Sequence, residues 1–184
     1  MNIFRLKGIN FLLILISIIF SYIFFNDQVA LRPALVLSGI IDYEGSFSPL
    51  KYYFLNSWTL LTQFAALLLK IGLDVKLISF FLVFILTTII FFSCYLILEK
   101  FTNDKYLSLI ITTFLIFFQK NLGDTDYPSL IFTIHTYGSY AQALTGLIIA
   151  SLLFNNLKFT ITLSFILLTI HPLVGLWVLV ILIL

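Results

Sequence analysis

Two carboxylates, Asp42 and Glu44, stand one residue apart in a polar stretch that follows the first apolar run of the chain. At this spacing in a loop, both side chains can turn toward one ligand, so that one acts as a general base or both hold a divalent cation. Lys51 follows in the same stretch and is a candidate for binding an anionic substrate. The competing interpretation is an ordinary solvated acidic pair, and the sequence leaves both open.

A second set of candidates lies in the C-terminal half of the chain. Asp124 and Asp126 have the same spacing and are further possible metal ligands, although the glycine and proline beside them suit an ordinary turn at least as well. His135 is either a hydrogen-bonded loop residue or a ligand. His171 lies in an apolar run, where histidine is costly unless it bonds a partner or lines a polar cavity. Pro172 offers a structural alternative, because a polar side chain can repair the backbone break that proline makes.

The elements that position these residues follow from a very apolar composition. Hydrophobic residues make up 61% of the 184 residues and charged residues 10%, and the mean hydropathy is +1.15. Soluble domains carry about 25% charged residues. The net charge of +2, without a basic run, argues against nucleic acid as a partner, and the single cysteine, Cys94, excludes a disulfide within the chain. The composition predicts an all-α integral membrane protein.

Continuous apolar segments predict about five transmembrane helices in a single polytopic domain. Their approximate ranges are 8–25, 76–98, 105–119, 137–154 and 159–180. Residues 52–73 are also long enough to cross, but they carry one narrow polar stripe at helical spacing. The stripe consists of Asn56, Thr59, Gln63, Ala66 and Lys70. We therefore predict an amphipathic helix at 52–73 that lies in the headgroup plane, within an extracytoplasmic loop at 26–75.

The predicted orientation depends on where polar residues converge. With or without a crossing at 52–73, five of the ten basic residues fall on the cytoplasmic side, so the positive-inside rule does not decide. Without that crossing, the four candidate carboxylates and His135 share the extracytoplasmic side, and ionisable groups near membrane depth tend to gather at one site. This favours a cytoplasmic N-terminus. The first apolar run is longer than a typical signal-peptide core and no small-x-small cleavage site follows it, so we predict a retained first span. The expected location is a bacterial inner membrane. The apolar end at 173–184 predicts that the chain is the N-terminal part of a longer protein.

The layout resembles the C-type membrane glycosyltransferases (GT-C superfamily). In that superfamily a first span precedes a large outer loop with an acidic D-x-D, D-x-E or E-x-D motif, which Asp42-x-Glu44 matches. Pro49-Leu50-Lys51-Tyr52-Tyr53 resembles the proline-led, tyrosine-rich start of the surface helix that follows. Gly72-Leu73-Asp74 resembles its glycine-led turn. The chain departs from the pattern in having one proline where the family has two, and in its short length.

The resemblance implies an enzyme that transfers a sugar from a polyprenyl-phosphate donor to an acceptor at the outer membrane face. Asp42 would be the general base toward the acceptor hydroxyl, and Glu44 its support or a metal ligand. Lys51, His135 and His171 would contact the phosphate or the acceptor. The later runs, His135-Thr136-Tyr137-Gly138 and His171-Pro172-x-x-Gly175, are similar to a pattern in poorly characterised multispanning proteins of the same layout.

Two other functional classes fit the sequence. A transporter or channel segment would need several ionisable residues deep inside spans, or discontinuous helices, and only His171-Pro172 suggests either. A membrane scaffold would need no site at all.

Small and polar residues at helical spacing are expected to pack helices together. They form two faces: Ser139, Gln142, Gly146 and Ala150 on one, and Thr160, Ser164, His171 and Gly175 on the other. Four aromatic residues are expected to be anchors at the membrane interface, namely Tyr52, Tyr53, Trp58 and Trp177.

Overall fold

The computed structural model describes residues 7–25, 32–42, 48–56, 58–117 and 137–183. All regular secondary structure within these ranges is helical, which confirms the predicted all-α class. The helices are α1 (Lys7–Phe24), α2 (Arg32–Ser38), α3 (Pro49–Asn56), α4 (Leu60–Lys70), α5 (Val75–Thr102), α6 (Lys105–Phe117), α7 (Tyr137–Leu153), α8 (Leu157–Ile170) and α9 (Pro172–Ile183).

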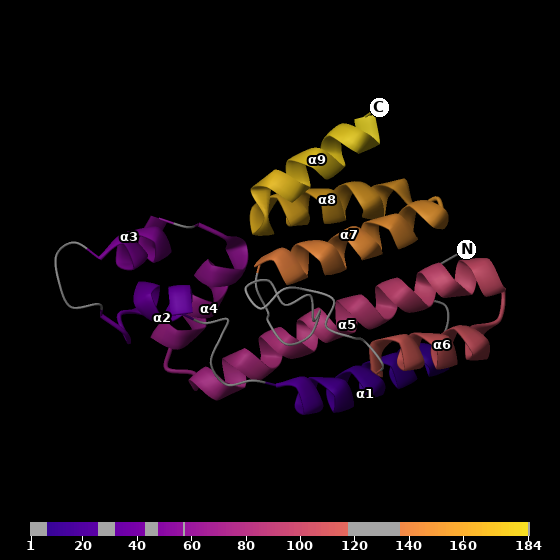
Figure 1. Cartoon of the computed structure of the whole chain (residues 1–184), viewed down its shortest axis with the longest axis horizontal. Coiled ribbons are helices and arrows are strands. Elements are labelled where there is room, and N and C mark those ends of the chain that lie inside the picture. The colour runs from indigo at the N-terminus through magenta and orange to yellow at the C-terminus, as the bar shows by residue number, and fades with distance from the viewer. Residues whose placement is uncertain (1–6, 26–31, 43–47, 57, 118–136, 184) are drawn as a thin grey trace.

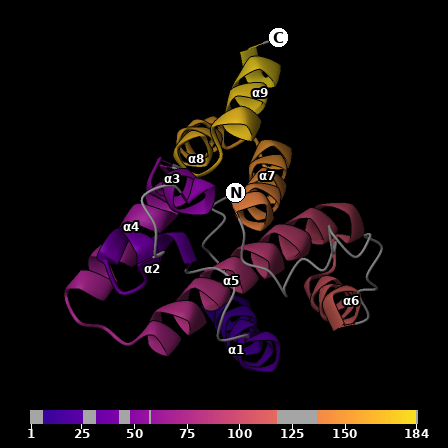
Figure 2. The ribbon, with the colours of Figure 1, turned by 60° about the vertical axis from the view of Figure 1, so that its left-hand side comes forward.

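The central element is α5, whose 28 residues pack against α1, α6 and α7. It separates α1 and α6 on one side from α7, α8 and α9 on the other (Figures 1 and 2). Residues 77–98 carry no charged side chain, and at about 1.5 Å per residue they extend about 33 Å, close to the thickness of a bilayer's hydrocarbon core. Within the described ranges, α5 is the one helix long and apolar enough to cross a membrane.

The bundle has two polar ends. At the first, which we call the lobe end, the short helices α2, α3 and α4 pack together beside the start of α5 (Figure 1). At the opposite end, the turn end, short connections join α5 to α6 and α7 to α8. The junction of α8 and α9 returns to the lobe end, where α8 touches α4.

Side-chain caps fix the helix ends between the apolar runs. Asp74 accepts hydrogen bonds from the first amides of α5, and Asp104 does the same for α6, with its Oδ1 2.9 Å from the amide of Tyr106. Asn103 closes α5 with a φ of 54°, a conformation that asparagine tolerates better than most residues. Polar residues that separate the apolar runs in the sequence are therefore helix caps in the structure.

Helices α5 and α7 approach closely through small and hydroxyl-bearing residues. Ser93 Oγ lies 2.6 Å from the carbonyl of Ile89 in its own helix and 3.2 Å from that of Ala143 in α7. A Cβ at Gly146 would lie 3.3 Å from Ser93 Cβ, so only glycine fits this crossing without a shift. The Tyr140 hydroxyl donates to the Leu82 carbonyl at 2.6 Å. These contacts confirm Gly146 as a packing residue.

The single helix predicted at 52–73 is wrong. The segment forms two helices, α3 and α4, and Thr59 begins the second by accepting the amide of Thr62 on its hydroxyl. Thr59 and Ala66, two members of the predicted polar stripe, are buried. A threonine that caps a helix satisfies an otherwise orphaned amide, and this local bond replaces the continuous helix.

The single span predicted at 159–180 is also wrong, because the chain folds back at His171. Pro172 has no amide hydrogen to continue α8, and α9 starts there and packs against α8. Gly175 allows this reversal, since a Cβ at that position would collide with the Leu168 backbone. Thr160 and Ser164 are buried along α8, as the predicted packing face requires.

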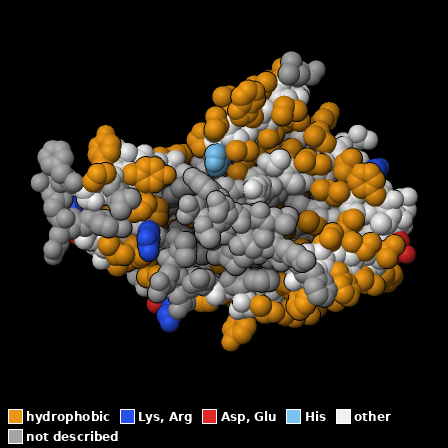
Figure 3. Space-filling view, in the orientation of Figure 1, with side chains coloured by type: hydrophobic (Ala, Val, Ile, Leu, Met, Phe, Trp, Pro, Cys, Tyr) orange, Lys and Arg blue, Asp and Glu red, His pale blue; other side chains and the backbone are white. Residues whose placement is uncertain are grey.

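On the face seen in Figure 3, hydrophobic side chains cover much of the described surface. Large hydrophobic side chains such as Phe11, Phe114 and Trp177 are exposed on α1, α6 and α9. Soluble monomers rarely expose contiguous apolar patches beyond a few hundred Å². The described charged side chains from Arg32 onward lie at the two polar ends: Arg32, Asp42, Lys51, Lys70, Asp74 and Lys76 at the lobe end, and Glu99, Lys100, Asp104, Lys105 and Lys158 at the turn end.

Candidate functional site

Two of the predicted site residues meet at the lobe end. The ammonium of Lys51 forms an ion pair with the Asp42 carboxylate, which stays largely exposed, with 77% of its side-chain surface accessible. Asp42 comes four residues after α2 ends, and Lys51 lies in the first turn of α3. The structure thus joins Asp42, the first residue of the acidic motif, to the proline-led helix that the sequence predicted.

Local sequence explains the position of each partner. Gly39, with a φ of 80°, ends α2 and turns the chain toward Asp42, while the amide of Ile40 bonds back to the carbonyl of Leu35 at 3.0 Å. At the start of α3, the Ser48 hydroxyl accepts the Lys51 amide at 3.4 Å, and Pro49 occupies the first helical position. Serine followed by proline is a favoured way to begin a helix.

The ion pair sets the chemistry available to Asp42. An exposed carboxylate can accept a proton from a hydroxyl, but a lysine ammonium on the same oxygen opposes the binding of a divalent cation. Among the described residues, no group of three or more His, Cys, Asp or Glu side chains is arranged to hold a metal ion. The pair is better suited to an anionic group, which would attract the Lys51 ammonium.

Four predicted site residues lie outside the described residues. They are Glu44, Asp124, Asp126 and His135. The cation-binding role for these carboxylates and the shared site with His135 stay predictions.

His171 is partly buried and links two helices. Its backbone amide donates to the Leu167 carbonyl at 2.8 Å, which ends α8, and its carbonyl accepts the Gly175 amide at 2.9 Å in α9. Its ring Nδ1 lies 3.4 Å from the Val174 amide, so the side chain caps the start of α9. This capping role matches the structural interpretation of His171, in which a polar side chain repairs the helix break at Pro172.

The structure does not pack His171 against the Asp42–Lys51 pair. Helix α2 packs on α3 and α4, whereas α8 packs on α7, α9 and α4. Helix α4 contacts both α2 and α8.

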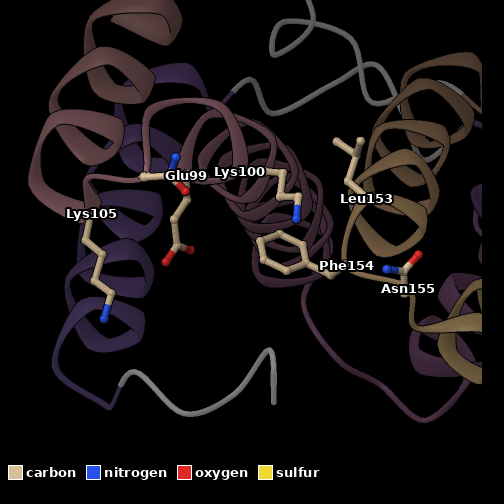
Figure 4. Close-up of a pocket in the computed structure, with 7 residues that line it drawn as sticks. Glu99, Lys100, Lys105, Leu153, Phe154 and Asn155 are labelled. Atoms are coloured by element: carbon tan, nitrogen blue, oxygen red, sulfur yellow. The ribbon is translucent and has the colours of Figure 1, made fainter.

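A second group of polar residues was missed by sequence reasoning. Glu99, Lys100, Asn103 and Lys105 line a cavity of about 420 Å³ at the turn end, together with Phe154 and Asn155 from the α7–α8 connection (Figure 4). In the sequence, these residues belong to two short segments that separate the apolar runs and lie about fifty positions apart. The sequence did contain one sign of this site, because the predicted topology places both polar segments on the cytoplasmic side of the membrane.

Comparison with known proteins assigns no family. Neither a protein-family model, nor a curated protein, nor a solved structure matches the chain significantly.

Proposed function

We propose that the chain is an integral membrane protein in which α1, α5, α6, α7 and α8 cross the bilayer. The lobe end would face the extracytoplasmic side of a bacterial inner membrane, with the N-terminus in the cytoplasm. The apolar surface and the collection of charges at two ends support this arrangement. Helices α6 and α8 extend only about 20 Å each, and a bilayer accommodates short spans by local thinning at modest cost.

At the lobe end, we propose transfer of a sugar from a polyprenyl-phosphate donor to an acceptor hydroxyl. The observation that carries this proposal is the Asp42–Lys51 pair, which couples the acidic motif to the proline-led helix outside the apolar bundle. A lipid-linked donor suits the location, because its chain would stay in the bilayer while its phosphate reached the lobe.

The pair suggests how the reaction would proceed. The donor phosphate draws the Lys51 ammonium away from Asp42, which frees the carboxylate. The acceptor oxygen then attacks the anomeric carbon and its proton passes to Asp42, while the bond from that carbon to the phosphate oxygen breaks. The departing phosphate takes the electron pair of that bond, and Lys51 stabilises its charge. Glu44 would support Asp42 or bind a metal ion, and His135 and His171 would contact the acceptor or the phosphate.

Sugar transfer in membranes that contain the chain tests this role. Asp42→Asn nearly preserves size but cannot take the proton, so transfer from a polyprenyl-phosphate sugar should fall about 100-fold or more. Lys51→Gln should mainly raise the KM for the donor. Asp104→Asn is the matched control, because it makes the same change at the turn end and asparagine also caps helices well. Unchanged transfer by Asp42→Asn would remove the catalytic role of the acidic motif.

The break between α8 and α9 favours a second candidate function. Transporters bind substrates and ions at discontinuous helices, and the two short helices meet at His171 without an intervening loop. Ion flux through proteoliposomes that is lost in His171→Ala, together with no detectable sugar transfer, would favour a transporter.

A further inference from the structure

The cavity at the turn end combines charges of both signs. Glu99 and Lys100 come from the end of α5, and Lys105 begins α6. Across the cavity lie Phe154 and Asn155, in the connection from α7 to α8 (Figure 4). The volume of about 420 Å³ falls in the range of small-molecule sites, about 300–1,000 Å³.

The Glu99 carboxylate is buried, and among the described residues no cationic group is paired with it. Its residue is only 7% exposed, and no ion pair joins it to Lys100 or Lys105 within the described ranges, where Lys51–Asp42 is the ion pair present. The Tyr95 hydroxyl, one turn earlier, lies near the carboxylate but makes no hydrogen bond among the described residues. A buried carboxylate in this state is costly, because burial removes its hydration without a compensating charge.

Neither of the two lysines forms an ion pair with Glu99 within the described ranges. The Lys100 ammonium lies 5.6 Å from the centre of the Phe154 ring, which favours a cation above its face. Figure 4 shows the Lys105 and Glu99 side chains extending along the same side of the cavity, from the two helices that meet there. A ligand that satisfies all three groups must carry both an anion and a cation.

The depth of the cavity indicates where such a ligand comes from. Glu99 directly follows the uncharged stretch at 77–98, so if α5 crosses the bilayer, the cavity lies at the level of the lipid headgroups. This step depends on the membrane embedding proposed above, and does not depend on glycosyl transfer.

We propose that this cavity binds the headgroup of a phospholipid that carries a phosphate and a primary ammonium, as phosphatidylethanolamine does. Lys100 and Lys105 bind the phosphate, and Glu99 accepts hydrogen bonds from the ammonium. A choline headgroup has no N–H to donate to Glu99. An anionic headgroup without an amine leaves the buried carboxylate unpaired.

Native mass spectrometry of the purified chain in detergent can measure this preference. The chain is titrated separately with phosphatidylethanolamine, phosphatidylcholine, phosphatidylglycerol and free phosphoethanolamine. We expect phosphatidylethanolamine to bind about tenfold or more tightly than phosphatidylcholine, the ratio for one charge-assisted hydrogen-bonded group. Equal affinity for the first three lipids would overturn the proposal. Tight binding of free phosphoethanolamine, equal to that of the lipid, would identify a soluble ligand and overturn the lipid assignment.

Variants assign the roles of the charges. Glu99→Gln should remove the preference for phosphatidylethanolamine over phosphatidylcholine while both still bind. The double variant Lys100→Gln, Lys105→Gln should weaken both. Lys158→Gln is the matched control, since it removes an exposed lysine at the same end that does not line the cavity. Helical circular dichroism identifies any variant that fails to fold, in which case Glu99→Asp replaces Glu99→Gln and should reduce the preference by shortening the side chain.

If the unsubstituted chain inserts into membranes but does not prefer phosphatidylethanolamine, only this proposal is overturned. Failure of insertion itself would overturn the proposed embedding first.

Discussion

The two polar ends of the bundle differ in how their opposite charges are arranged. At the lobe end, Lys51 and Asp42 are joined in an ion pair that water reaches freely. At the turn end, Glu99 is buried while Lys100 and Lys105 stay apart from it around a cavity. An exposed pair contributes little to stability, whereas separated charges around a cavity leave binding energy for a ligand. Under the two proposals above, the lobe end would give up its pair during a reaction, and the turn end would acquire its partners from a bound lipid.

The most decisive test of this contrast asks whether the two ends face opposite sides of a membrane. In a Cys94→Ala background, Ile40→Cys at the lobe end should react with an impermeant maleimide added to intact cells. Leu157→Cys at the turn end should react only after the membrane is permeabilised. Both positions are exposed in the structure, so protection reflects the bilayer. Labelling of both positions from one side would show that the ends are not separated by a membrane.

The next largest effect is expected from the helix pair that keeps the ends apart. Gly146→Leu places a large side chain against Ser93, where even a Cβ is tight, and should destabilise the bundle by about 3 kcal/mol. The reaction of Cys94, in the adjacent α5, with a fluorescent maleimide during heating reports this unfolding. Ile149→Leu, at an exposed position of the same helix, should leave the midpoint nearly unchanged. An unchanged midpoint for Gly146→Leu would mean that the two helices are not closely packed there.

A smaller effect of opposite sign is expected at the turn end. Glu99→Gln removes a buried charge without changing shape, so in lipid-free detergent it should stabilise the chain by about 1–2 kcal/mol. Thermal unfolding of both proteins measures the difference. Destabilisation by a similar amount would show that the carboxylate already has a partner within the protein.

The smallest effect should be the coupling across the lobe-end pair. A double-mutant cycle with Asp42→Asn and Lys51→Gln should give less than about 1 kcal/mol in denaturant unfolding, since both side chains contact water. A coupling free energy above about 2 kcal/mol would show that the pair stabilises the fold, and that a substrate could not easily separate it.

The positions of the long helices could be predicted from the sequence, because apolar runs and helix caps are local features that neighbouring residues determine. Predicted spans 76–98 and 137–154 correspond to α5 and α7 within a few residues. The break before Thr59 was missed because a hydroxyl can either line a helix or cap one, and only tertiary packing selects between them. The fold-back after His171 was likewise hidden, since a proline inside an apolar run can kink a span or end it.

The candidate sites show the same limit. Asp42 and Lys51 were found because they are only nine positions apart in the sequence. The cavity around Glu99 was missed because Phe154 and Asn155 reach it through the packing of α5 on α7, which periodicity alone does not specify.

The short connection between α5 and α6 has a consequence for biogenesis. Only Asn103 and Asp104 separate the two helices, and both are used as caps. Helix α6 has 13 residues, so it would insert weakly by itself into a hydrocarbon layer about 30 Å thick. Once α5 is anchored, the tether keeps α6 beside it at a high effective concentration. The two helices would therefore enter the membrane as one hairpin, and lengthening this turn should delay the insertion of α6 far more than that of α5.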